Sequence, residues 1–301
     1  MITELIKSAL TKEYSKELRN ILDQTNKNFN ACGIAPQGLC IPFTEKRGTL
    51  KAEAIKGVEM WDLESDIYNT SVLKSAGAKF HLNLKSDVLV PLASKVNCYW
   101  EGETDATEDA STTVTEQRIN PKRLSTTLNV SKLFVMQMTN AEQLLSEMVA
   151  QAINDKIEST IFSTQTTENA VSNLLTDDAT TITDYSSICD MEEQTADVVT
   201  PTYILSKTAK TKLRQMQKTN GSNVMDNGKI DGTNTVTSSN VENNYLLFGD
   251  FSKLHVCIWG DGIDVTIDPV TQATQGEVKL IINFYVDYYI SNSNAITFAK
   301  V

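Results

Sequence analysis

Residues 139–162 read TNAEQLLSEMVAQAINDKIESTIF, and this stretch decides the fold more than any other. Thr139 and Glu142 match a capping box, in which the Thr hydroxyl accepts from the amide of Glu142 and the Glu carboxylate accepts from the amide of Thr139. Apolar residues then recur at spacings of three and four, which predicts a long helix over residues 140–162 with one buried face. The side chains expected to pack against a sheet are Leu145, Met148, Ala152 and Ile153.

The residues before this helix predict a projecting hairpin. Residues 101–109 read EGETDATED, with five acidic residues in nine, and such a segment cannot lie in a core. Residues 112–130 are rich in threonine, which favours an extended strand, and they carry several basic residues. We therefore expect residues 96–130 to form two extended limbs around a charged, exposed tip.

Short patterns predict the remaining elements. Alternating runs at 80–84 and 88–92 indicate strands before the hairpin. After residue 163 the composition turns polar, which indicates a domain boundary and then an acidic helix over about 186–194. Residues 202–205 predict a buried strand, with Ser206 as the N-cap of a helix over 207–218 that ends at Asn220-Gly221. The last expected elements are a polar loop over 222–244 and strands over 254–259, 263–267 and 278–290.

Composition limits the class of protein. The chain has 301 residues, of which 41% are hydrophobic, so it can bury a full core. Its formal net charge of −11 argues against a protein whose main task is to hold DNA or an anionic membrane, because such binding needs clustered Lys and Arg. Residues 1–22 predict an amphipathic helix rather than a signal peptide, and no apolar run approaches the ~18 residues of a membrane span. We expect a soluble protein made in the cytoplasm, with no membrane partner.

No pattern in the sequence supports catalysis or cofactor binding. The only histidines, His81 and His255, fall in expected strands, where a structural histidine is the simpler interpretation. The five cysteines lack CxxC spacing, and neither a Walker loop nor a GxGxxG motif occurs. The acidic clusters do not fit the spacing of a calcium loop, and the basic residues of 207–218 are interpreted as a solvated helix face. We therefore expect no enzyme, no catalytic residue, no cofactor and no metal.

Several short motifs, taken in order, resemble the major capsid proteins of tailed bacteriophages. Trp100-Glu101-Gly102 precedes the acidic tip, and Asn120-Pro121-Lys122-Arg123-Leu124 and Val130-Ser131 follow it before the long helix. The same order continues towards the C-terminus with Tyr203-Ile204-Leu205-Ser206, Phe248-Gly249-Asp250-Phe251 and Val286-Asp287. Each motif alone is weak. Their order and spacing, over residues 96–301, carry the resemblance.

The resemblance implies an α+β fold of the HK-ninety-seven type. This fold combines an N-terminal arm, an extended loop, a peripheral domain with a long spine helix, and an axial domain. The implied boundaries are 1–49 for the arm, 50–95 for the first part of the peripheral domain, 96–130 for the extended loop, 131–165 for the spine helix, 166–275 for the axial domain and 276–301 for C-terminal strands of the peripheral domain. The arm helix could pack on its own body or lie across a neighbouring subunit, and the resemblance favours the neighbour.

The resemblance also implies a function, that of a shell subunit that works by self-assembly. Pentamers and hexamers would form an icosahedral head enclosing the double-stranded DNA of a tailed phage, without binding that DNA specifically. Scaffolding, portal and decoration proteins are the other implied partners. The protein would be found in the virion, after assembly in the cytoplasm of the host bacterium. Many members of the family begin with a scaffolding domain that is cleaved during maturation. Only about fifty residues precede the peripheral domain here, which implies either a separate scaffolding protein or a first helix that is a reduced remnant of such a domain.

Two groups of residues are expected to matter for the shell. The extended loop is expected to contact a neighbouring subunit, with acids of one loop against bases of the next, through Trp100, Glu101, Glu103, Asp105, Glu108, Asp109, Arg118, Lys122 and Arg123. The structural residues of the spine helix are Thr139, Glu142, Leu145, Met148, Ala152 and Ile153. The lysine that crosslinks one member of the family is absent from Glu103-Thr104-Asp105-Ala106, so the resemblance does not imply covalent links here.

Two other interpretations stay open at this point. An encapsulin-like compartment that encloses a cargo enzyme would share the same fold. A soluble enzyme or a carbohydrate-binding β-rich module would instead need a deep pocket lined by perturbed acids or aromatics.

Overall fold

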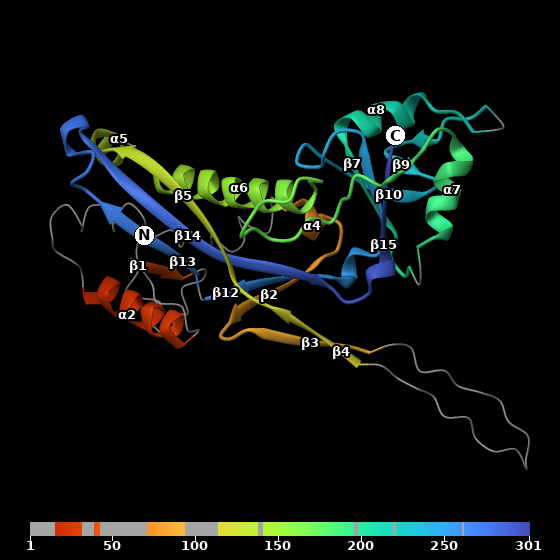
Figure 1. The fold of residues 1–301 in the computed structure, drawn as a ribbon. Coiled ribbons are helices and arrows are strands. Elements are labelled where there is room, and N and C mark those ends of the chain that lie inside the picture. Colours follow the sequence, from red (N-terminus) through yellow and green to blue (C-terminus); the bar gives the residue numbers. More distant parts are fainter. Residues whose placement is uncertain are drawn as a thin grey trace, which may run out of the picture.

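The computed structural model describes residues 16–31, 39–42, 71–93, 114–137, 141–195, 198–218, 221–260 and 262–301. It contains two main sheets, and a two-stranded ribbon that extends away from both of them (Figure 1). Statements below refer to these residues.

The first sheet is organised by one long strand, β14. Its strands have the order β1-β13-β14-β12-β2, and β5 also pairs with β14. The bounds are β1 Leu39–Pro42, β2 Lys79–Leu84, β5 Lys122–Ser131, β12 Leu254–Trp259, β13 Gly262–Asp268 and β14 Glu277–Ile290. Every second residue of β14 from Val278 to Tyr288 is buried, which is the period-2 pattern of a strand with one face against the core.

The helix α6, Ala141–Ile161, covers this sheet, so the helix expected over 140–162 is confirmed (Figure 1). Its buried row is Leu145, Val149, Ile153 and Ile157, and it shares one core with Leu280, Ile282 and Phe284 of β14. The same core includes Ile204, Leu247 and Ile296 of the second sheet, so the two sheets share a continuous apolar interior.

The outward side of α6 differs from the expectation. Met148 is 48% exposed, so the prediction that its side chain packs on the sheet is wrong. Ala152 is also exposed, so the prediction that it is buried on the sheet is wrong too. The buried face is instead widened by Ala150, Asn154 and Glu158. A helix with 3.6 residues per turn turns only one side towards the sheet, and Asn154 and Glu158 occupy part of that side. Met148 therefore lies on the outer flank of the helix. The cap residue Thr139 lies outside the described residues, as does the Glu142 side chain.

The second sheet has seven strands in the order β6-β15-β11-β7-β10-β9-β8. Their bounds are β6 Thr180–Thr181, β7 Thr202–Ser206, β8 Met225–Asp226, β9 Lys229–Ile230, β10 Thr233–Ser238, β11 Tyr245–Gly249 and β15 Ile296–Lys300. Two helices, α7 (Tyr185–Glu193) and α8 (Lys207–Gln215), share a core with one face of it. The expected N-cap at Ser206 is confirmed, because its hydroxyl accepts from the amide of Ala209 at 3.2 Å.

The expected loop over 222–244 is wrong in part, since β8, β9 and β10 lie within it. Asn227 and Gly228 have φ of 48° and 76°, the left-handed geometry of a two-residue hairpin turn. The polar strand β10 pairs in parallel with the buried β7, and this non-local pairing has no signature in its composition. The helix expected over 207–218 ends at Gln215, because Met216 turns to an extended conformation and accepts from Val224.

The division into sheets does not follow the predicted boundaries at 165 and 275. Strands β12 and β13, placed in the axial domain by the sequence, pair with β14 in the first sheet. Strand β15, placed with the peripheral domain, pairs with β11 in the second sheet. The physical reason is that β-pairing joins segments far apart in the chain, so a linear boundary cannot separate the two sheets.

The motif Phe248-Gly249-Asp250-Phe251 marks the end of β11 and needs its glycine. Gly249 has φ of +155°, and a Cβ there would lie 2.2 Å from the carbonyl oxygen of Ala295. Asp250 then caps the short 3₁₀ helix η1, Phe251–Lys253, by accepting from the amide of Ser252. Phe248 and Phe251, on the two sides of this turn, are buried. The chain can therefore pass from the second sheet to the first only if the residue at position 249 has no side chain.

The described part of the N-terminal arm packs on its own body. The helix α2, Lys16–Ala31, buries Leu22 and Phe29, and the Phe29 ring lies against Gly260. Strand β1 pairs antiparallel with β13. The expectation that the arm favours a neighbouring subunit is therefore wrong for residues 16–31 and 39–42, because their apolar side chains find partners within the chain.

The burial of α6 gives a direct test of the fold. Replacing Leu145, which is 4% exposed, by Asp would place an unpaired charge in the shared core and should destabilise the subunit by more than about 4 kcal/mol. Met148→Asp, three residues along the same helix, should change stability by less than about 1 kcal/mol because that side chain is half exposed. Urea unfolding of the two variants measures the difference. Equal stability of the two would contradict this packing.

Candidate subunit interfaces

The projecting ribbon is a two-stranded hairpin that stands on the first sheet. Strand β3, Val88–Ala93, pairs antiparallel with β4, Val114–Ile119, in register from Val88 opposite Ile119 to Ala93 opposite Val114. Figure 1 shows it extending away from the body. Leu89 is 59% exposed on this ribbon. Its apolar surface is thus free to meet another molecule.

The base of the hairpin is fixed by Trp259 at the end of β12. The indole Nε1 donates to the carbonyl oxygen of Ser86 at 2.8 Å, and the ring is 1% exposed. Ile119 and Cys257 pack with it in a small separate core. Burial raises the pKa of the Cys257 thiol to about 11, which keeps the thiol neutral. The sequence analysis did not single out Trp259, although a buried tryptophan usually pairs its N–H with an acceptor.

Only three of the expected contact residues of the loop, Arg118, Lys122 and Arg123, lie in the described part of the chain. Trp100, Glu101, Glu103, Asp105, Glu108 and Asp109 lie outside the described residues. Arg118 is on β4, where its Nε donates to the Asp87 carboxylate at 3.0 Å, so its charge already has a partner in the same hairpin.

Lys122 and Arg123 are not in the hairpin, which corrects the expected extent of 96–130. They begin β5, whose ten residues pair with β14, with Arg123 opposite Tyr285. Lys122 is half-buried near Asp287, whose pKa burial raises and Lys122 partly lowers. The threonine-rich stretch therefore divides at Asn120-Pro121, because its second half has a buried strand, β14, to pair with.

The two histidines form a pair on the face of the first sheet. His81 of β2 and His255 of β12 approach to 2.8 Å between Nε2 and Nδ1, and the His255 ring stacks on Tyr289 at 4.7 Å between centroids. Burial, and then the positive charges of His81 and Lys79, lower the pKa of His255. The two imidazole rings are hydrogen-bonded to each other across adjacent strands, which agrees with a structural role for both histidines.

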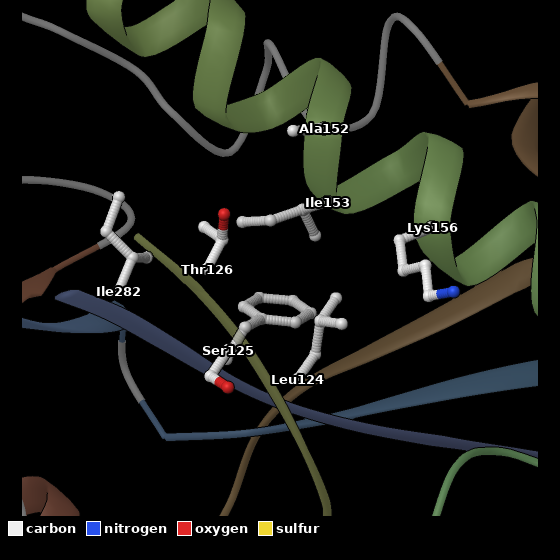
Figure 2. Close-up of a pocket in the computed structure, with 8 residues that line it drawn as sticks. Leu124, Ser125, Thr126, Ala152, Ile153, Lys156 and Ile282 are labelled. Carbon is white, nitrogen blue, oxygen red and sulfur yellow. The ribbon is translucent and has the colours of Figure 1, made fainter. Parts of the chain in front are cut away.

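One cavity, of about 280 Å³, lies between α6 and the strands β5 and β14. Figure 2 shows its described lining, which is Leu124, Ser125, Thr126, Ala152, Ile153, Lys156, Ile282 and Phe284. Lys156 is the charged member of this set. Within the described ranges, no three His, Cys, Asp or Glu side chains lie close enough to hold a metal ion. None of the described helices is long and apolar enough to cross a membrane.

Comparison with known proteins agrees with this architecture. The sequence matches the phage capsid family over residues 67–301, which is most of the chain. The chain belongs to the phage capsid family. No protein in the curated collection of characterised sequences matches it.

Solved structures similar to this capsid protein include the capsids of GTA particles and a structure of a phage. The capsid of the native GTA particle is 15% identical with a TM-score of 0.60, over 85% of this chain and 95% of that one. The capsid of the empty GTA particle is 17% identical with a TM-score of 0.62, over 84% and 94%. Gordonia phage Cozz is 12% identical with a TM-score of 0.55, over 85% and 91%. At these identities the likeness establishes the fold, and the α+β capsid fold expected from the motifs is confirmed.

In this capsid protein the two sheets are joined at a buried carboxylate, Glu158 of α6. It is 2% exposed and accepts from the amide of Val72 at 2.6 Å and from the hydroxyl of Ser71 at 3.1 Å. Its other oxygen accepts from the side-chain amide of Asn240, which follows β10, at 3.0 Å. One side chain thus caps the short helix α4, Val72–Ser75, and holds the end of the second sheet.

A second carboxylate reinforces this junction. Glu242 accepts from the amide of Thr164 at 2.7 Å, and its own amide donates to the carbonyl oxygen of Phe162 at 3.1 Å. The segment 240–242 is therefore bonded along the C-terminal part of α6. The sequence analysis missed both acids, although Glu158 could have been noticed as a charged residue inside the apolar period of the helix.

The junction predicts a dependence of stability on pH. Burial raises the pKa of Glu158 above its ordinary value of 4.5, against the opposite effect of hydrogen bonds from Asn240 and Val72. Because the folded state then binds more protons than the unfolded state, stability should fall as pH rises from 4.5 through the folded-state pKa. Glu158→Gln should remove this part of the fall, while Glu158→Ala should cost about 2–4 kcal/mol at neutral pH by leaving buried donors unpaired.

Unfolding in urea between pH 4 and 8 measures the effect, with Glu168→Gln, an exposed acid in the segment that follows the same helix, as the control. The junction would be contradicted by a Glu158→Gln profile that follows that of the wild type at every pH.

Proposed function

We propose that this major capsid protein assembles through pentamers and hexamers into the icosahedral head of a tailed bacteriophage, which encloses double-stranded DNA. The match to the phage capsid family over residues 67–301 carries the proposal. It is supported by a body of two joined sheets from which a hairpin projects, since a projecting ribbon with an exposed Leu89 suits contact with another subunit.

The proposal assigns each of the two sheets to one domain of the capsid fold. The first sheet with α6 would form the peripheral domain, and the second sheet with α7 and α8 the axial domain. On this assignment the arm is residues 1–49 with its described helix held on the body, and the extended loop is the hairpin from Val88 to Ile119. Such a protein acts by forming a wall. Catalysis has no part in this role.

Partners and location follow from the same proposal. The packaged DNA would be enclosed without specific binding, which suits a net charge of −11. Scaffolding, portal and decoration proteins would act during and after assembly in the bacterial cytoplasm, and the mature protein would be in the virion.

Particle formation tests the proposal directly. The purified chain should form capsomers or closed shells in sedimentation and in negative-stain electron microscopy. Virus particles containing the chain should be filled with DNA. A small uniform shell filled with protein cargo would instead indicate an encapsulin-like compartment. A monomer that never associates, alone or with a scaffold, would contradict a shell function.

The proposed loop contact concerns one base, Arg123. Arg118 is paired with Asp87 and Lys122 is half-buried, so Arg123, which is exposed on β5, is the base best placed for acids of a neighbouring loop tip. Arg123→Glu should leave the subunit folded but reduce shell yield at low salt, because exposed pairs contribute up to ~1 kcal/mol each and are screened.

Reversal of Glu103, Asp105 and Glu108 to Lys in the same chain should restore part of the yield, which electron microscopy can count. Thr127→Glu, exposed on the same strand, controls for added negative charge. Unchanged shells from Arg123→Glu would exclude this contact.

A further inference from the structure

The two helices on the second sheet carry opposite charge. The α8 sequence KTAKTKLRQ has four basic residues and no acid, whereas α7, YSSICDMEE, has three acids and no base. Both helices cover the same face of the sheet, since Ile188 and Met191 of α7 share a core with Ala209 and Leu213 of α8. Their outward sides therefore present a basic and an acidic surface on one domain.

These charges are placed against the helix dipoles. The acids of α7, at Asp190, Glu192 and Glu193, fall at its C-terminal end, where the dipole is already negative. Lys207 and Lys210 fall in the first turn of α8, where the dipole is positive. Both placements disfavour the isolated helices, and each would be favourable beside the opposite charge.

No such opposite charge is supplied within the described chain. The ion pairs formed by described residues join Arg118 to Asp87, Lys218 to Asp231 and Lys300 to Asp177. Glu192 accepts from the hydroxyl of Tyr203. Asp190, Glu193, Lys207 and Lys210 take part in none of these described contacts, and all but the half-exposed Lys210 are exposed.

The fold keeps the two groups apart. The end of α7 lies beside the start of β15, because the Thr195 and Thr297 hydroxyls are 2.7 Å apart. In the sheet, Thr297 pairs with Phe248, and Phe248 with Tyr203 near the start of β7. The other end of β7 is Ser206, which caps α8. The five residues of β7 span ~13 Å from end to end, and Figure 1 shows α8 across the top of the domain and α7 along its side.

We infer that the acidic end of α7 in one subunit contacts the basic start of α8 in the next, so that the second domains join head to tail around a ring. A contact between two different patches of the same chain is heterologous, and it closes into a ring when the rotation allows. The inference rests on the proposed shell function and names the contact that forms its rings. The occupant is a second copy, because each added copy supplies one acidic patch for every basic patch.

The basic stripe could in principle face DNA phosphates instead. The acidic end of α7 lies on the same face of the same sheet and would repel a polyanion, so a second copy fits both surfaces better. Exposed charge clusters of this kind should change each contact about tenfold, and the effect should weaken as salt rises.

Charge reversal on either side tests the contact. Lys207→Glu with Lys210→Glu, and separately Asp190→Lys with Glu193→Lys, should each weaken ring and shell formation about tenfold per contact, as measured by sedimentation at several salt concentrations. The chain combining all four changes should restore assembly. Lys156→Glu with Lys229→Glu, two exposed bases on other elements, matches the first variant in charge and should assemble normally.

A second readout separates the contact from misfolding. Each double variant places the charge that the helix dipole favours, so the thermal midpoint of the unassembled subunit should stay equal or rise while assembly falls. Normal assembly of both double variants, or no rescue in the fourfold variant, would overturn the contact. A basic-side variant that assembles normally but retains less DNA would assign the stripe to DNA. Absence of rings and shells from the wild type would overturn the shell function itself, and the contact with it.

Discussion

The packing of α6 on β14 is the interaction on which the other parts depend. Strand β14 has 14 residues, and its alternate side chains from Val278 to Tyr288 form one apolar row. The row of Leu145, Val149, Ile153 and Ile157 lies over it. Burial of several large aliphatic side chains contributes ~1.5–3 kcal/mol each, so their sum is larger than a single hydrogen bond or ion pair among the described residues contributes. The strands β5, β12 and β13 then take their places by pairing with β14.

Polar groups settle what apolar packing leaves open. The shared core alone would allow the second sheet to slide on the first, because apolar contacts have little directional preference. Glu158 removes this freedom by accepting from Ser71, Val72 and Asn240, three donors from two separate segments. Trp259 has the same effect at the hairpin, where its indole bonds to the Ser86 carbonyl. Because these bonds hold the sheets and the hairpin in place, the projecting parts keep a fixed orientation relative to the body.

The surfaces of the molecule are consistent with a protein that is completed by its neighbours. The hairpin leaves Leu89 exposed, and the outer flank of α6 leaves Leu144 and Met148 exposed. Charges on α7 and α8 are placed where each helix alone disfavours them. Features of this kind reduce the stability of a single chain, and they are retained where association offsets that cost.

The sequence by itself determined the local elements of this protein. The period of residues 141–161 gave the long helix, Ser206 gave the start of α8, and the order of short motifs gave the family, because each of these signals lies within a few neighbouring residues. Only the tertiary structure decided which strands pair, and with it the division into sheets. The polar strand β10 is ordered by β7, and the threonine-rich stretch divides between the hairpin and β14. The tertiary structure also placed Glu158 on the inner side of α6 and Met148 on the outer side, since burial depends on what each face of a helix meets.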